Sequence, residues 1–297
     1  MPELPEVESV RRQLEPGLVG RRIERVEIAD SRLVRPYEPV EVAAELEGER
    51  VAALERRGKY LIVRFESGRV LLIHLRMTGS LRHAPAGTLE PDPYRRAVVS
   101  LDDGSDVAYR DVRRFGTWLV LEPEEAGPYL DARVGPEPLD GVFTAARLGE
   151  RLARRRAPVK AVLLDQRTLA GLGNIYVDEA LWRARINPLR SAASLDRDEL
   201  RRLHRGIRSA LVHGIARQGS TLRDYALPDG GSGRMQDEFR VYGRGGEPCS
   251  RCGTPIARTR VAGRGTWLCP RCQPEPESQA ASSASSSPSR SRRQSSA

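Results

Sequence analysis

Four cysteines constrain the C-terminal part of this chain more than any other feature. They form two Cys-x2-Cys pairs, Cys249 with Cys252 and Cys269 with Cys272, and sixteen residues separate the pairs. No cysteine is left over, and no basic and apolar secretory signal opens the sequence. Because disulfide frameworks belong to oxidising compartments, this spacing favours four thiolate ligands for one structural Zn²⁺.

The segment between the two cysteine pairs predicts a short hairpin. Residues 260–267 read as two strands joined at Gly263, Arg264 and Gly265. A turn clamped by a metal would hold Arg264 outward and rigid, and a guanidinium group suits a phosphate. In a chain so rich in arginine, a solvated surface side chain is the plainer alternative.

Composition narrows the class of protein. The 297 residues suffice for two domains, and 49 basic against 40 acidic side chains leave a net charge of +9, which favours a polyanionic partner. All but two of the basic residues are arginine, the exceptions being Lys59 and Lys160. No apolar run approaches the ~18 residues of a membrane-spanning helix. We therefore expect a protein of the cytoplasm that does not enter membranes.

Periodicity divides the chain into parts. Residues 1–132 contain a helix at about 5–15, which Pro16 and Gly17 should end, and then short apolar or alternating stretches typical of an antiparallel β-sandwich. Residues 133–238 are helical, with helices expected at 143–155, 158–164, 174–184 and 196–216 and a Gly-rich loop after the last. Residues 239–273 hold the cysteines. Residues 274–297 form a Ser- and Arg-containing tail that we expect to be disordered.

The N-terminus carries the first candidate for chemistry. Removal of Met1 would expose the secondary amine of Pro2, a usable nucleophile near neutral pH. Attack of such an amine on a sugar aldehyde carbon gives an iminium ion. Glu3 and Glu6 would lie beside it as carboxylates able to carry protons. An ordinary helix start, with proline and glutamate in the first turn, explains the same residues.

Two further segments place unusual residues in turns. Met77 follows His74 in a polar, glycine-containing turn, and an exposed apolar side chain of this kind can enter a base stack. Phe115 stands beside Arg113 just before a strand, a pairing suited to stacking on bases and gripping phosphates. Packing of either loop residue on a neighbour is the simpler alternative.

Taken together, six segments in fixed order resemble the bacterial formamidopyrimidine-DNA glycosylases, which remove 8-oxoguanine and ring-opened purines. The segments are MPELPEVE (1–8), RGKYL (57–61), HLRMTG (74–79), RRFG (113–116), GLGNIY (171–176) and the four-cysteine unit. The likeness runs from residue 1 to about 273. It implies an α+β fold with an N-terminal β-sandwich and flanking helices, a helix-two-turn-helix DNA-binding domain with a lid loop, and a C-terminal zinc finger.

The resemblance also implies a role for each matching residue in a bifunctional glycosylase and abasic-site lyase. Pro2 would be the nucleophile, Glu3 the general acid/base, and Glu6 a supporting carboxylate. Lys59 would assist β-elimination, and Arg264 would bind the phosphates flanking the lesion and serve δ-elimination. The remaining matches would contact damaged double-stranded DNA: His74, Met77, Tyr94, Arg113, Phe115, Arg155, Lys160 and Asn174.

Some features depart from the family or leave alternatives open. Tyr94 stands where the family often has a DNA-binding histidine. An endonuclease VIII-like enzyme for oxidised pyrimidines shares Pro2 and Glu3, although Leu4 argues against it because those proteins usually open Pro-Glu-Gly-Pro-Glu. A DNA-binding zinc protein without turnover is the alternative from another class. Nothing in the sequence indicates a dimer seam, so we expect a monomer.

Overall fold

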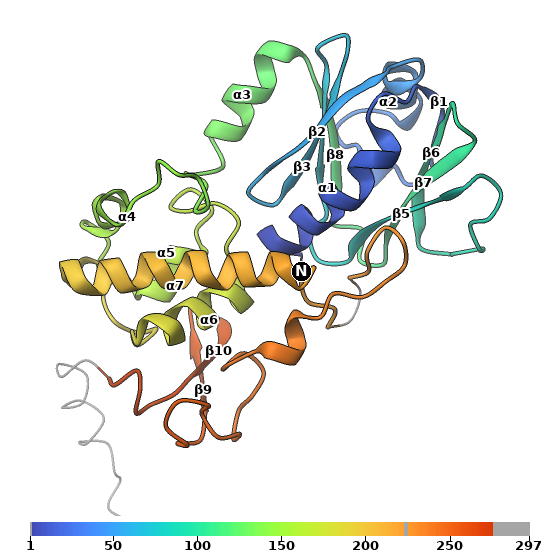
Figure 1. Ribbon diagram of the computed structural model, residues 1–297. Helices are drawn as coiled ribbons and strands as arrows, with labels where there is room; N and C mark the ends of the chain where they lie inside the picture. Colours follow the sequence, from blue (N-terminus) through green and yellow to red (C-terminus); the bar gives the residue numbers. More distant parts are fainter. Residues whose placement is uncertain (1, 223–224, 276–297) are drawn as a thin grey trace, which may run out of the picture.

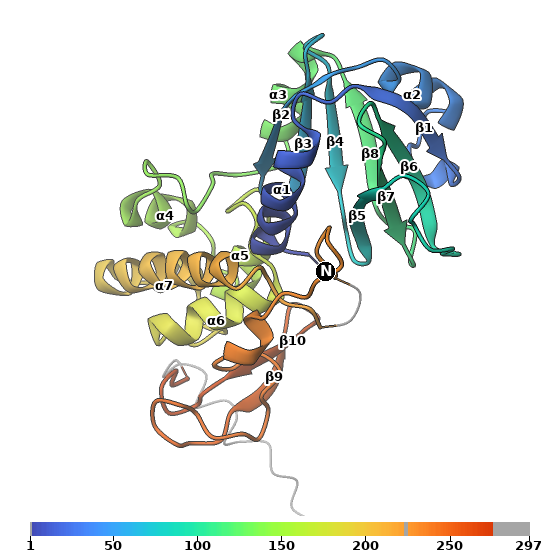
Figure 2. The ribbon, with the colours of Figure 1, turned by 45° about the vertical axis from the view of Figure 1, so that its right-hand side comes forward.

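The structure is a computed structural model that describes residues 2–222 and 225–275. A β-sandwich lies above a helical unit, and a hairpin unit lies beneath the helices (Figures 1 and 2). The expected disordered tail from 276 onward, Met1, and part of the expected lid loop at 223–224 lie outside the described residues. Among the described residues, no helix has the length and apolar character needed to span a membrane.

Two four-stranded antiparallel sheets form the sandwich. One has the order β1-β6-β7-β5 and the other β2-β3-β4-β8. Their facing side chains, such as Leu61, Ile73, Val99 and Trp118, are buried in one apolar core. The strands are β1 Ile23–Ile28, β2 Val51–Arg57, β3 Tyr60–Phe65, β4 Val70–His74, β5 Gly79–Pro85, β6 Arg95–Leu101, β7 Ser105–Asp111 and β8 Thr117–Leu121. The predicted sandwich is confirmed.

Three helices flank the sandwich. They are α1 (Leu4–Leu18), α2 (Pro39–Leu46) and α3 (Pro123–Asp131), with a 3-10 turn, η1, at Ser31–Leu33. Helix α1 continues past the proline at 16, where the sequence predicted its end, because Leu14 and Leu18 lie four residues apart on its buried face. Its residues from Val7 onward pack in the sandwich core, whereas Leu4 packs in the core of the helical unit. Helix α1 therefore joins the two units.

The helical unit surrounds a second core. Its helices are α4 (Ala145–Leu152), α5 (Val159–Leu164), α6 (Asn174–Ala184) and α7 (Arg197–Ala216), with 3-10 turns η2 (Ala192–Ser194) and η3 (Met235–Glu238). Asp196 caps α7, accepting hydrogen bonds from the N–H groups of Asp198 and Glu199, both at 2.8 Å. Two successive turns connect α5 to α6, and Gln166 braces them through Gly171 N–H and the Leu172 carbonyl.

The C-terminal unit is a two-stranded hairpin of β9 (Ala257–Val261) and β10 (Arg264–Leu268). The chain reverses at Ala262 and Gly263, both with positive φ, so Arg264 opens β10 beside the turn. Trp182 of α6 packs against the cysteines of this unit. Gln273 fastens it further, because its side-chain amide donates to the Ile186 carbonyl at 2.9 Å.

Candidate active site and nucleic-acid interface

The carboxylate of Glu3 lies at the N-terminus of α6. Its oxygens accept hydrogen bonds from the N–H groups of Gly173 at 2.7 Å and Ile175 at 2.9 Å. A Cβ on residue 173 would lie 2.4 Å from Glu3 Cδ, so only glycine leaves room for this carboxylate. The glycines of the GLGNIY segment therefore have a structural cause: they let the helical unit hold a residue of the N-terminus.

Glu6 occupies a second buried position one turn further along α1. It accepts hydrogen bonds from Glu3 N–H at 2.9 Å, from the Tyr176 hydroxyl at 2.9 Å and from Ser220 N–H at 2.8 Å. Sequence reasoning missed Ser220 as a site residue, because its partner is more than two hundred positions away. Tyr176 lies in the GLGNIY segment, but no local pattern predicted its contact with Glu6.

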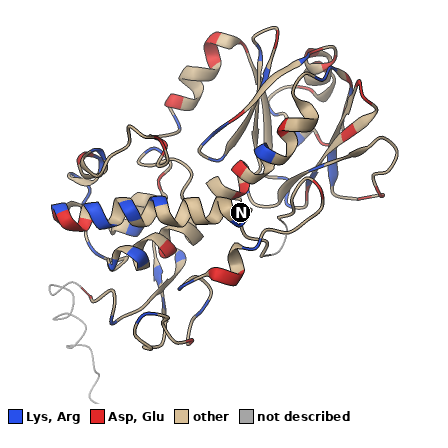
Figure 3. Cartoon of the chain, in the orientation of Figure 1, with Lys and Arg blue, Asp and Glu red and all other residues tan. Residues whose placement is uncertain are grey.

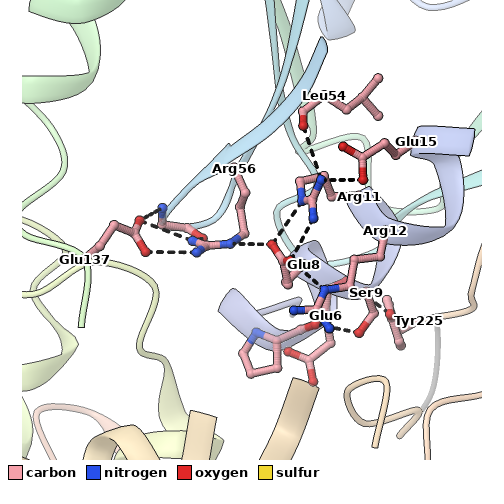
Figure 4. A network of polar contacts seen from close by, with 12 residues as sticks. Glu6, Glu8, Ser9, Arg11, Arg12, Glu15, Leu54, Arg56, Glu137 and Tyr225 are labelled. Atoms are coloured by element: carbon pink, nitrogen blue, oxygen red, sulfur yellow. Dashed lines mark hydrogen bonds and ion pairs between the residues drawn. The ribbon is translucent and has the colours of Figure 1, made fainter. Parts of the chain in front are cut away.

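Lys59 lies in the turn between β2 and β3, and it is 5% exposed. An ion-pair network fixes this turn (Figure 4). The carboxylate of Glu137 binds the Arg56 guanidinium at 2.9 and 3.2 Å and accepts a hydrogen bond from Gly58 N–H. Arg56 also binds Glu8 of α1 at 3.2 Å. The segment that connects the two units therefore anchors both the Lys59 turn and the helix that begins behind Pro2.

Burial shifts the pKa values of Glu3 and Lys59. Loss of water raises the pKa of the Glu3 carboxyl, although the positive charge of Lys59 opposes that shift. Loss of water likewise lowers the pKa of the Lys59 ammonium group, and Glu3 opposes this change. A carboxyl that keeps its proton longer and an amine that gives it up more readily are suited to proton transfer near neutral pH.

A cavity of about 530 Å³ opens at Pro2 and Glu6. Both units contribute to its lining, and its volume falls within the range of small-molecule sites, roughly 300–1,000 Å³. Tyr242 and Tyr225 belong to the lining, and neither was predicted as a site residue. The lining residues are Pro2, Glu6, Met77, Thr78, Arg113, Ile175, Ser220, Leu222, Tyr225 and Tyr242.

Three predicted DNA-contacting side chains form an exposed cluster at the rim of this cavity. Met77 is 39% exposed and Phe115 is 51% exposed. The guanidinium of Arg113 joins them, with its Nη1 at 3.0 Å from Met77 Sδ and its Cζ 4.8 Å from the Phe115 ring centre. We call Met77, Arg113 and Phe115 the wedge. Large apolar groups held out in solvent beside a cation have the form of a stacking platform for bases.

Tyr94 is also exposed, and two arginines surround its ring. The Cζ atoms of Arg110 and Arg96 lie 5.0 and 5.9 Å from its centre. Arg155, in the turn after α4, has an exposed side chain whose Nη2 is 4.0 Å from Asp165. Both side chains are exposed and therefore accessible to a polyanion.

The structure places two other predicted DNA contacts inside the protein. His74 is buried, its Nδ1 accepts a hydrogen bond from Arg76 N–H at 3.0 Å, and burial lowers the pKa of its imidazole to about 3. Lys160 is fully buried, and its Nζ reaches Asp178 Oδ1 at 2.7 Å, Thr266 Oγ1 at 2.8 Å and the Gly265 carbonyl at 3.0 Å. Both groups are therefore buried and support the loops that bear Met77 and Arg264, and their contact with DNA stays a prediction.

Helix α6 holds the β9–β10 hairpin. Besides the Lys160 contacts, the Asn174 amide donates to the Gly265 carbonyl at 3.0 Å, and Asp178 Oδ2 accepts from Trp267 N–H at 3.1 Å. Arg258, Arg260 and Arg264 are exposed, with Arg264 on the opposite face of the hairpin from the other two. Basic residues mark these strands in Figure 3. The Asn174 side chain thus faces the hairpin in this structure and not open solvent.

The four cysteines gather as a metal site. Their Sγ atoms all lie within 4.8 Å of one another. Four sulfurs at ~2.3 Å from a zinc ion would be separated by about 3.8 Å, so the set fits tetrahedral Zn²⁺. Arg251 N–H and the Trp182 indole N–H both point at Cys249 Sγ, at 3.5 and 3.4 Å, as donors do toward a bound thiolate. Cys249, Cys252, Cys269 and Cys272 are therefore ligands for one structural zinc ion.

Comparisons with known proteins agree with this geometry. Family models match in chain order: the formamidopyrimidine-DNA glycosylase N-terminal domain (1–118), the H2TH domain of the same enzymes (134–226), and a zinc finger found in FPG and IleRS (246–274). The fold and the site thus define a DNA glycosylase of the helix-two-turn-helix class.

Whole-chain relatives narrow the class to one family. Formamidopyrimidine-DNA glycosylases of Geobacillus kaustophilus and Symbiobacterium thermophilum are 51% and 50% identical, covering 92% and 94% of this chain and 100% and 92% of theirs. A Lactococcus lactis FPG mutant solved with Fapy-dG containing DNA is 40% identical, with a TM-score of 0.86, covering 92% of this chain and all of its own. MutM solved with carbocyclic 8-oxo-G containing DNA is 39% identical over the same shares, also at 0.86. The chain belongs to the formamidopyrimidine-DNA glycosylase family.

Proposed function

We propose that this protein is a base-excision repair enzyme that removes oxidised purines, 8-oxoguanine and formamidopyrimidines, from double-stranded DNA and then cleaves the abasic site. The observation that carries the proposal is the position of Pro2. It lines a cavity of nucleoside size and directly precedes Glu3, a buried carboxyl whose pKa the charge of the buried Lys59 also affects. Relatives across the whole chain bear the corresponding enzyme name.

The first half of the reaction follows from these groups. With Met1 removed, the Pro2 nitrogen attacks C1′ of the damaged nucleoside, the bond from C1′ to the base breaks, and the base leaves. Departure of the base is coupled to opening of the sugar ring, which converts the adduct to an iminium ion and requires a proton on the ring oxygen. Glu3 is placed to deliver that proton because burial raises the pKa of its carboxyl. Glu6 accepts a hydrogen bond from the backbone N–H of Glu3 and so orients Glu3 and the adjoining Pro2.

The second half is strand cleavage. Loss of a C2′ proton from the iminium ion expels the 3′ phosphate in β-elimination, and Lys59 assists that proton transfer. A second elimination expels the 5′ phosphate, and Arg264 neutralises the phosphates from the hairpin. Water then releases Pro2 from the sugar fragment. The zinc ion takes no part in these steps. The residues that bind it hold the hairpin rigid.

DNA recognition is assigned to the surfaces around the cavity. The enzyme must turn the damaged base out of the stack, and the wedge would fill the gap that the base leaves. The proposed DNA contacts also include Tyr94, Arg155, Asn174, His74 and Lys160, of which Asn174 and Lys160 lie beside the hairpin. We expect one copy of the chain to suffice, working on the nucleoid in the cytoplasm, with a sedimentation mass near 33.0 kDa.

A trapping experiment tests the proposal. The protein is incubated with borohydride and a duplex that carries 8-oxoguanine opposite cytosine, and a parallel duplex carries thymine glycol. Borohydride reduces the iminium ion to a stable amine, so we expect a covalent band on the first duplex that a Pro2→Gly variant does not form. Intact-mass measurement confirms loss of Met1. Trapping on thymine glycol alone would indicate pyrimidine repair, and no adduct despite DNA binding would indicate a protein without turnover.

A further inference from the structure

One buried carboxylate joins the two loops that carry the wedge. Asp111 ends β7 and is 1% exposed. Its Oδ1 accepts hydrogen bonds from the Thr78 hydroxyl and from Arg113 N–H, the latter at 3.2 Å, and its Oδ2 accepts from Gly116 N–H at 2.7 Å. Thr78 directly follows Met77. The carboxylate therefore links the Met77 loop, after β4, to the loop that carries Arg113 and Phe115, after β7.

The backbone of both loops needs such support. Arg76 and Arg114, the neighbours of Met77 and Arg113, have φ of 53° and 59°, a left-handed conformation that L residues adopt at a cost. Each is held by a separate contact. Arg76 N–H donates to His74 Nδ1 at 3.0 Å, and the Arg114 guanidinium pairs with Asp30 Oδ1 at 2.7 Å.

Packing beneath the loops leaves them little room to move apart. A Cβ on Gly79 would lie 2.4 Å from Tyr109 Oη, and a Cβ on Gly116 would lie 1.7 Å from the same atom. The Tyr109 hydroxyl thus touches the backbone of both loops at their glycines. Asp111 and Tyr109, two residues apart on β7, form a common floor for the wedge.

We propose that Asp111 is a positioning residue that sets Met77, Arg113 and Phe115 as one preassembled unit for insertion into the DNA stack. This inference rests on the proposed function and deepens it. Asp111 does not line the cavity at Pro2, and its two carboxylate oxygens accept hydrogen bonds only from Thr78, Arg113 and Gly116 among the described residues. Its contribution should therefore appear on duplex substrates, where a base must be displaced, and be absent on a single strand.

The test compares two substrates with one set of variants. Asp111→Asn keeps the shape but puts an amide N–H₂ where the carboxylate accepted a hydrogen bond. Thr78→Val keeps the carboxylate but removes the hydroxyl that donates to it and that accepts a hydrogen bond from Arg113 N–H at 2.9 Å. Asp106→Asn, on the same strand, is the matched control, because Asp106 accepts from Ser100 Oγ at 2.7 Å, away from the wedge. Each variant is measured for excision of 8-oxoguanine from a duplex and for borohydride trapping on a single-stranded abasic oligonucleotide.

We expect Asp111→Asn to lower the rate of excision from the duplex by at least about tenfold and to leave trapping on the single strand unchanged. Thr78→Val should act in the same direction and less strongly, and Asp106→Asn should match the parent on both substrates. A 2-aminopurine base next to the lesion should report slower unstacking in stopped-flow fluorescence for Asp111→Asn.

The outcomes separate this inference from the proposed function. If the parent protein traps neither substrate, the proposed function fails. If the parent is active and Asp111→Asn and Thr78→Val lower the activity equally on both substrates, Asp111 is a general structural residue and the positioning role is overturned. A thermal melt of each variant identifies unfolding. If Asp111→Asn does not fold, Thr78→Val, which leaves Asp111 with its two N–H donors, decides alone.

Discussion

At the scale of single residues, the buried pair of Glu3 and Lys59 predicts how base release depends on pH. Burial raises the pKa of Glu3, so its carboxyl stays protonated to a higher pH than usual and base release slows as pH rises through that value. Glu3→Gln should lower the rate of 8-oxoguanine release by at least about 10²-fold, the scale of general acid catalysis. Single-turnover kinetics against pH would show both effects. An alkaline decline that persists in Glu3→Gln would contradict the assignment.

A second residue-scale prediction concerns Lys59. Its lowered pKa follows from burial and allows the amine to accept a proton during β-elimination. Lys59→Met should slow cleavage of a duplex with a preformed abasic site, by roughly 10²-fold. Arg56→Lys serves as the comparison, since it disturbs the network behind the turn without removing the Lys59 amine. Gel separation of the products measures the cleavage rate. Equal losses of cleavage rate in the two variants would assign Lys59 a structural role only.

At the scale of elements, the buried Lys160–Asp178 pair predicts a stability effect. Lys160 comes from α5 and Asp178 from α6, and both side chains are inaccessible to solvent. Lys160→Met would leave the Asp178 carboxylate buried without its partner and lower the free energy of unfolding by about 3–5 kcal/mol. The double variant Lys160→Met with Asp178→Asn should regain part of that loss. Urea titration monitored by circular dichroism measures the free energy of unfolding of both variants. An unchanged free energy of unfolding in Lys160→Met would refute the argument.

Elements also show how far the sequence alone reaches. The helical period predicted α6 and α7 near their observed bounds, because that signal is local. Helix α1 extends beyond its predicted end because burial of Leu18 outweighs the cost of the proline. Contacts across long separations, such as Glu3 with Gly173 and Lys160 with Thr266, escaped prediction, because no pattern within a segment encodes a partner more than a hundred positions away.

At the scale of the whole molecule, DNA affinity should depend on salt and on zinc. Binding to a duplex with an abasic-site analogue should weaken linearly in log Kd against log salt, with a slope that falls by about 1 in Arg264→Ala and stays unchanged in Asn174→Ala, whose parent side chain is neutral. Fluorescence anisotropy at several salt concentrations gives the slopes. An unaltered slope in Arg264→Ala would remove its guanidinium from the phosphate contacts.

Zinc removal is the second prediction at this scale. Cys252→Ser should lose the metal and release the hairpin, so duplex affinity should fall by roughly tenfold or more while the sandwich core stays folded. Zinc content by a chromophoric chelator, anisotropy and near-ultraviolet circular dichroism together report these effects. Retained affinity in a zinc-free sample would show that the clamp is dispensable for binding.

The burial of both lysines has a consequence for covalent regulation. Lys59 is 5% exposed and Lys160 is fully buried, so every cationic side chain on the described surface is an arginine. Acetyl donors neutralise lysine amines but leave guanidinium groups charged. Acetylating conditions that weaken lysine-based DNA binding would therefore leave the surface charge of this protein intact. Because both lysines are buried and the exposed cations are arginines, the surface charge available for DNA binding does not depend on the acetylation state of the cell.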